Sequence, residues 1–70
     1  MNEVENRVRV LPARYVTVDL AATITGLSAA AIRKRIERGQ WLEGREWRRG
    51  PDDRIWIDTE GVTRWVEGTA

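Results

Sequence analysis

Two short helical segments separated by the tetrapeptide Thr-Gly-Leu-Ser constrain this chain more than any other feature. Gly26 suits the left-handed backbone that follows a helix end, and the side chain of Ser28 suits the cap of the next helix. Thr17 is suited to cap the preceding segment in the same way. The pattern therefore predicts helices over residues 18–25 and 29–38, joined by a tight turn.

The apolar positions predict which side of each helix is buried. In the first helix, Leu20, Ala21 and Ile24 fall at i, i+1 and i+4, which predicts one inward face. In the second helix, Ile32 and Ile36 mark the buried stripe. Apart from Glu37, the rest of the second helix is small or cationic, so the pair has the pattern of a helix-turn-helix.

A β-hairpin is predicted next, in the stretch REWRRGPDDRIWID. Pro51 suits the second position of a type I turn and Asp52 the third. Asp53 then takes the left-handed position of a three-residue loop. The strand pairs that this turn sets are Arg49 with Ile55, Trp47 with Ile57, and Arg48 with Trp56.

A last short helix follows the hairpin, capped by Asp58 or Thr59 and ended by Gly68. Its inward face is predicted at Val62, Trp65 and Val66. Helix-turn-helix, hairpin and helix together predict an α+β fold, a small winged-helix domain over residues 15–68. Residues 1–14 are predicted to form a flexible N-terminal arm or an edge strand, because Arg and Val alternate over residues 7–10.

The core of this domain must be small, because a chain of 70 residues buries only about 60% of its unfolded surface. Four Trp and no Phe supply most of the large apolar side chains. Trp41, Trp47 and Trp65 are predicted to pack in the core. Trp56 is predicted to cover the outer face of the hairpin with Arg48 stacked on it.

Composition argues against catalysis. The chain has no Cys and no His, which removes disulfides, zinc–thiolate sites and the commonest general base. Ser28 and Tyr15 are candidate nucleophiles, but Ser28 fits a helix cap and Tyr15 a core or rim position. We therefore predict no catalytic residue, no metal, no cofactor and no small-molecule substrate. No apolar run reaches the ~20 residues of a membrane span, and the expected location is the cytoplasm.

Charge is distributed unevenly along a chain whose net charge is only +1. Residues 33–49 carry seven cations and three carboxylates, a net of +4. Residues 55–70 carry one cation and three carboxylates, a net of −2. A local basic surface of this kind attracts phosphates.

The candidate DNA-contact residues lie in two groups. On the second helix they are Ser28, Ala30, Arg33, Lys34, Arg35, Glu37 and Arg38, and on the hairpin Arg48, Arg49 and Arg54. Arg33 and Lys34 are the best candidates for base or groove contact, and Arg35 and Arg38 for phosphate contact. The alternative for both groups is a solvated basic surface. Two carboxylates, Asp52 and Asp53, oppose contact at the hairpin tip.

Three segments resemble the small excisionase-like proteins of temperate phages and prophages, within the wider MerR-like winged-helix group. They are VTVDLAATITGLSAAAIRKRIERGQW, REWRRGPDDRIWID and VTRWV, which fall within residues 15–66. The resemblance implies a protein without catalytic activity that binds and bends double-stranded attachment-site DNA. It also implies assistance to integrase in excision, cooperative self-association on DNA, and location at the nucleoid of the bacterial host cell.

Two other functions fit the same residues. A small prophage transcriptional regulator would use the same DNA-binding surface, and a protein–protein interaction adaptor would use the Trp-rich surface instead. Salt-dependent binding to duplex DNA separates the DNA-binding functions from the adaptor.

Overall fold

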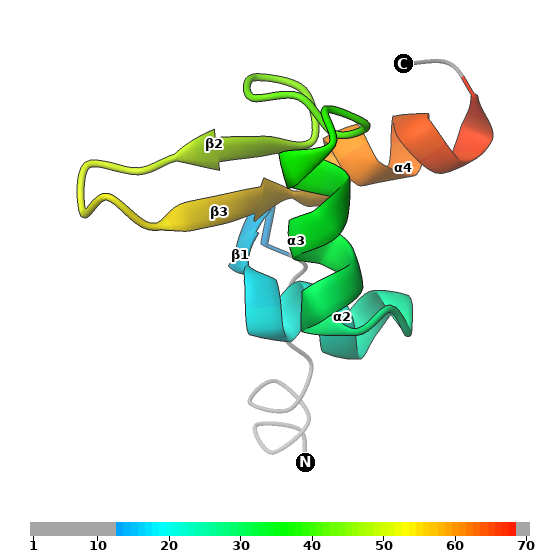
Figure 1. Ribbon diagram of the computed structural model, residues 1–70, viewed down its shortest axis with the longest axis horizontal. Coiled ribbons are helices and arrows are strands. Elements are labelled where there is room, and N and C mark those ends of the chain that lie inside the picture. Colours follow the sequence, from blue (N-terminus) through cyan, green and yellow to red (C-terminus); the bar gives the residue numbers. More distant parts are fainter. Residues whose placement is uncertain (1–12, 69–70) are drawn as a thin grey trace, which may run out of the picture.

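A computed structural model describes residues 13–68 as three helices and one three-stranded antiparallel sheet (Figure 1). The elements in chain order are β1 (Tyr15–Thr17), α2 (Val18–Thr25), α3 (Ala29–Glu37), β2 (Trp47–Arg49), β3 (Ile55–Asp58) and α4 (Thr59–Glu67). The strand order is β1-β3-β2. This α+β arrangement confirms the predicted fold class and is compatible with a winged-helix-like fold.

The caps of α2 and α3 form as the sequence predicts. Thr17 Oγ1 accepts a hydrogen bond from the Leu20 amide at 3.2 Å, and Ser28 Oγ accepts one from the Ala31 amide at 3.0 Å. Gly26 has a φ of 82° and closes α2 through its amide. Helix α2 has the predicted bounds, and α3 ends one residue early because Arg38 is its C-cap.

The hairpin has the predicted register. The partners across β2 and β3 are Trp47 with Ile57, Arg48 with Trp56, and Arg49 with Ile55. Asp53 adopts a φ of 66°, the left-handed position expected of it. Figure 1 shows this hairpin extending to one side of the helices, with α4 on the other side.

Strand β1 was not predicted. Val16 pairs with Ile57 of β3, so β1 becomes an edge of the sheet and brings Val16, 5% exposed, into the core. Three residues are too few to show a strand period, and only the long-range partner defines this strand. The edge strand predicted from residues 7–10 lies outside the described residues.

The core lies between one face of the sheet and the helices. Ile32 is fully buried, and Trp41 is 1% exposed with its ring edge-on to Trp65 at 5.5 Å between centroids. Trp47 and Trp65 are partly buried against this cluster, as is Ile36. The buried apolar residues are Val16, Val18, Ala21, Ile32, Trp41, Ile57 and Val62.

Three predicted core positions were wrong. Leu20 and Ile24 are 48% and 57% exposed, because α2 turns Val18 inward together with Ala21, the one residue of the predicted face that is buried. Val66 is 70% exposed because α4 packs through its first turns, and Figure 1 shows its C-terminal end directed away from the strands.

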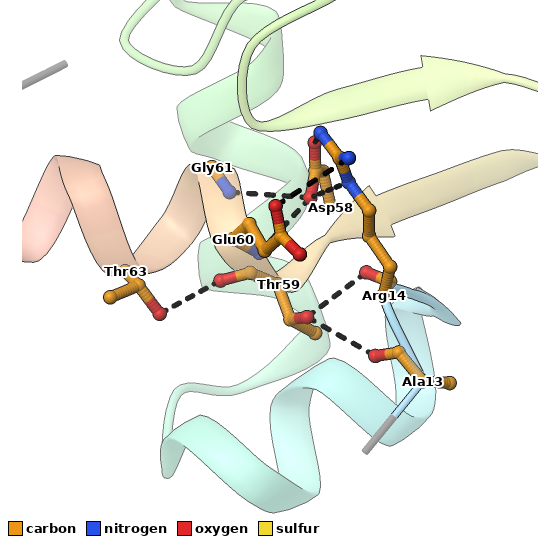
Figure 2. A network of polar contacts seen from close by, with 7 residues as sticks. All are labelled: Ala13, Arg14, Asp58, Thr59, Glu60, Gly61 and Thr63. Atoms are coloured by element: carbon orange, nitrogen blue, oxygen red, sulfur yellow. Dashed lines mark hydrogen bonds and ion pairs between the residues drawn. The ribbon is translucent and has the colours of Figure 1, made fainter. Parts of the chain in front are cut away.

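A buried carboxylate joins the start of β1 to the start of α4 (Figure 2). Asp58 is 1% exposed and accepts hydrogen bonds from the amides of Glu60 and Gly61, as the N-cap of α4. Arg14 donates to both of its oxygens, at 3.2 and 3.1 Å. The Thr59 hydroxyl donates to the carbonyls of Ala13 and Arg14, so the chain before β1 is fixed on the first turn of α4.

The ionisation of Asp58 makes this junction sensitive to acid. Burial raises the pKa of Asp58, but the hydrogen bonds from Arg14, Gly61 and Glu60 lower it by more, and the pKa lies below its ordinary value. A carboxyl that is more acidic in the folded protein stabilises it above the unfolded pKa of about 4. That contribution is lost as the pH falls through the folded pKa.

We predict that Asp58→Asn lowers the free energy of unfolding by about 1–2 kcal/mol at pH 7, where half-exposed Arg14 limits the loss. The difference from the wild type should shrink below about pH 4, because the wild-type carboxyl is then protonated too. Urea unfolding followed by Trp fluorescence at pH 7, 5 and 3 measures this. Glu67→Gln, an exposed change on the same helix, is the control, and a difference that stays constant with pH contradicts the assignment.

Gly61 allows α4 to contact the loop before β2. A Cβ at this position would overlap the carbonyl oxygen of Arg45, which is backbone and cannot move aside as a side chain can. Gly61→Ala should therefore destabilise the protein by about 1–3 kcal/mol. The sign is diagnostic, because alanine in an unobstructed helix interior gains about 1 kcal/mol over glycine. Thermal melting of Gly61→Ala beside Glu67→Ala tests this, and a raised melting temperature would show that α4 does not approach the loop.

Candidate nucleic-acid interface

The outer surface of α3 carries cations that have no side-chain partner among residues 13–68. Arg33, Lys34 and Arg38 are exposed, and within residues 13–68 their side chains make no ion pair or hydrogen bond. Glu37 is exposed beside them and pairs with none of them in this part of the chain. Ala30, also exposed, leaves the helix backbone accessible one turn earlier. The helix thus presents uncompensated positive charge to solvent.

Arg33 faces the hairpin across an open cavity of about 290 Å³. Arg49 and Arg54 line the same cavity from the hairpin, so three arginines from two elements border it. The lining residues are Val18, Asp19, Arg33, Arg49, Asp53, Arg54 and Ile55. Val18 and Asp19, at the start of α2, were not predicted to lie at this site, because only the tertiary structure brings that turn beside the hairpin.

Arg49 is held in place within the hairpin. Its Nη1 donates to the Asp53 carbonyl at 3.0 Å and lies 3.6 Å from the Asp53 carboxylate. Its guanidinium also lies 5.9 Å from the centroid of the Trp47 ring. A cation fixed in this way loses little conformational freedom when it meets an anion.

The tip carboxylates have partners inside the hairpin. Asp52 accepts from the Trp56 ring nitrogen at 3.2 Å and from the Arg54 amide at 3.1 Å. The Trp56 hydrogen bond, with that of the Arg54 amide, lowers the pKa of Asp52, so this group stays ionised. Asp53 is paired with Arg49. Both charges predicted to repel DNA are therefore partly offset by hydrogen bonds or cations of the hairpin itself.

Arg48 lies on the opposite face of the sheet from Arg49. It is exposed, and its cross-strand partner is half-buried Trp56. The predicted stacking of Arg48 on Trp56 is not observed among the described residues, and Trp56 bonds to Asp52 instead. Arg48 is thus separated from the arginines that face α3.

Arg35 also lies apart from that cavity. Its guanidinium is 5.4 Å from the centroid of the Trp65 ring and 6.0 Å from that of Trp41. Its buried Nε has no hydrogen-bond partner in the described part of the chain. The side chain is half-buried on the flank of α3 that meets α4. Its predicted phosphate contact is untested, and this position favours a packing role. Ser28, also among the candidates, is exposed and caps α3.

The described residues carry few other features of a functional site. Within residues 13–68, no helix combines the length and the apolar composition needed to cross a membrane. The same residues contain no cluster of three His, Cys, Asp or Glu side chains able to hold a metal ion.

The protein is a small α+β domain compatible with a winged-helix-like fold, and its basic helix lies beside a basic hairpin. The family model "Putative excisionase (DUF1233)" matches residues 7–70. The chain therefore belongs to this excisionase family, which indicates a role in phage excision and recombination. No curated protein and no solved structure matches the chain. Excisionases are recombination directionality factors and not enzymes, so the prediction of a non-enzymatic protein is confirmed.

Proposed function

We propose that this protein binds double-stranded DNA with α3 in the major groove and the β2–β3 hairpin, as a wing, at the adjacent minor groove. The observation that carries the proposal is that Arg33, Arg49 and Arg54 line one cavity between helix and hairpin. A helix and a wing that occupy neighbouring grooves must straddle the DNA strand between them. We assign Arg49 and Arg54 to the phosphates of that strand, because guanidinium groups suit phosphate oxygens, and Arg33 to the groove on the helix side.

The remaining contacts follow from exposure. Lys34 and Arg33 are assigned to groove or base contact and Arg38 to a flanking phosphate, since none of them has a side-chain partner within the described residues. Ser28, Ala30 and Glu37 complete the exposed surface of α3. Arg48 is assigned to a phosphate contact from the other face of the wing. We assign Arg35 to holding α3 against Trp41 and Trp65.

We further propose that the DNA is an attachment site, that binding bends it, and that the complex assists integrase in excision. A helix as short as α3 reads few base pairs, so one protomer discriminates weakly and several bind side by side. The cost of bending, a few kcal/mol, is then shared among protomers. The protein acts in the cytoplasm of the bacterial host, at the nucleoid. Membership of the excisionase family supports this role.

Affinity for duplex DNA should depend steeply on salt. If α3 and the wing neutralise about 4–7 phosphates, log K falls with log salt at a slope of about −4 to −6. Lys34→Ala and Arg33→Ala should each weaken binding by about 5- to 100-fold without lowering the melting temperature, because both side chains are exposed. Fluorescence anisotropy over a salt series measures both effects.

Arg64→Ala is the charge-matched control, because Arg64 belongs to α4 and its replacement removes the same single charge. It should change affinity and slope only slightly. Equal losses in all three variants would show that net charge, and not the surface of α3, attracts the DNA, and a flat salt response would exclude a DNA-binding function.

The excision role is tested in a purified recombination system. Adding the protein to integrase and attachment-site DNA should stimulate excision, and Lys34→Ala should reduce that stimulation. DNA with tandem sites should be bound cooperatively and bent, as measured by gel mobility of circularly permuted fragments. Non-cooperative binding to a single unbent promoter site, without any effect on recombination, would assign the protein to transcriptional regulation instead.

A further inference from the structure

Another open cavity lies on the face of the sheet opposite the core. It has a volume of about 370 Å³ and is bordered by β2, β3 and the turn between them. Arg48 and Trp56 are cross-strand partners on this face, because neighbouring side chains along a strand point to opposite sides and Ile57 points into the core. The lining residues are Tyr15, Arg48, Arg49, Gly50, Pro51 and Trp56.

The Trp56 ring is held in place at this cavity. Its Nε1 donates to the Asp52 carboxylate at 3.2 Å. A Cβ at Gly50 would lie 2.6 Å from the same nitrogen, so the ring rests directly against the glycine backbone. Trp56 is half-buried and therefore keeps part of its surface open to a ligand. A ring that is already ordered loses little conformational entropy when it binds.

The charge at this cavity is positive and uncompensated. Arg48 is exposed, and its side chain makes no hydrogen bond or ion pair within residues 13–68. Arg49 lines this cavity as well as the one beside Arg33. Asp19 and Asp53 border the cavity beside Arg33, whereas the described residues that line this one include no carboxylate. The outer cavity therefore suits an anion, and Arg49 makes it continuous with the candidate nucleic-acid interface.

An ordered aromatic ring beside an unpaired guanidinium has the chemistry to receive a nucleotide. The guanidinium suits the phosphate, and the flat apolar face of the ring suits the sugar or the base. The bases of a duplex are stacked inside it, so the sugar is the part that a ring at the rim of a groove reaches. A minor groove is only about 6 Å wide and has one strand on each side. Figure 1 shows the hairpin extending past the helices, which leaves room for DNA at both of its faces.

We propose that the outer face of the wing binds the second strand of the minor groove, with Arg48 on a phosphate and Trp56 on the adjoining deoxyribose. This inference rests on the proposed placement of the wing in that groove. Arg54 lines the cavity beside Arg33 and not the outer one, so it contacts the first strand. An acidic peptide would also complement Arg48, but the continuity of the two cavities through Arg49 favours DNA.

The first test replaces single phosphates of an attachment-site duplex with uncharged methylphosphonates, on one strand at a time. Wild-type affinity, measured by fluorescence anisotropy, should fall about three- to tenfold at positions on both strands. Arg48→Gln should remove this sensitivity on one strand and Arg54→Gln on the other. The two variants are matched, because each removes one charge from an exposed residue of the hairpin. Sensitivity that Arg48→Gln leaves unchanged, or removes from the same strand as Arg54→Gln, would overturn the proposal.

The second test separates the ring from the charge. Trp56→Phe keeps a flat ring and should bind the duplex within about twofold of the wild type, whereas Trp56→Leu should bind about five- to twentyfold more weakly. Equal affinities of the wild type and both variants would overturn the proposal. Melting curves establish that each variant is folded at the temperature of the assay, and the phosphate test needs no change at Trp56.

A failure of this inference differs from a failure of the proposed function. A wild-type protein that does not bind duplex DNA in a salt-dependent way would overturn both. If Lys34→Ala weakens binding while Arg48→Gln and Trp56→Leu bind as the wild type does, only the contact of the outer face with DNA is overturned. Variants of the outer face that bind DNA normally but no longer stimulate excision would assign this face to a protein partner and overturn the proposal.

Discussion

Strand β3 holds the fold together, because both of its edges are paired. One of its ends joins the hairpin turn, and the other provides the cap of α4. Its backbone bonds β1 on one side and β2 on the other. Ile57, at its centre, is buried beneath the helices, and Asp58, at its end, caps α4. A sheet of three short strands is stable only with a covered apolar face, and here α2, α3 and α4 supply that cover.

This arrangement explains how a chain of low net charge presents a basic site. The hairpin that continues from β3 carries Arg49 and Arg54 toward Arg33 of α3, so the cations gather at one cavity. Two carboxylates, Asp19 and Asp53, line the same cavity, while other carboxylates are used elsewhere in the fold. Asp58 caps a helix, fully buried Glu46 accepts from Arg45 and from the Leu42 amide, and the two tip aspartates have partners inside the hairpin. Net charge alone therefore understates the potential at the candidate interface.

The same separation divides stability from binding. The side chains that hold the domain together are buried or fixed by partners, such as Ile32, Trp41 and Asp58. The side chains proposed to contact DNA, Lys34 above all, are exposed and make no contact on which the described fold depends. Arg35 belongs to the first group although its neighbours belong to the second, because the flank of a helix on which a residue falls decides whether it meets the core or the solvent.

Local chemistry determined what the sequence could predict by itself. The caps at Thr17, Ser28 and Asp58 and the left-handed positions of Gly26 and Asp53 depend on neighbours within four residues, and so does the hairpin register. The two groups of basic residues, on α3 and on the hairpin, could be predicted because each group is contiguous or nearly so in the sequence.

Tertiary structure decided the features that depend on distant partners. Strand β1 forms only because it pairs with β3. Leu20, Ile24 and Val66 are exposed because of the way α2 and α4 pack. Arg35 is positioned by its contacts with Trp41 and Trp65. The position of Arg33 at the same cavity as Arg49 and Arg54 is also decided by tertiary structure. A periodic pattern shows that a helix has an apolar face, but only packing against the rest of the chain determines which residues of that face are covered.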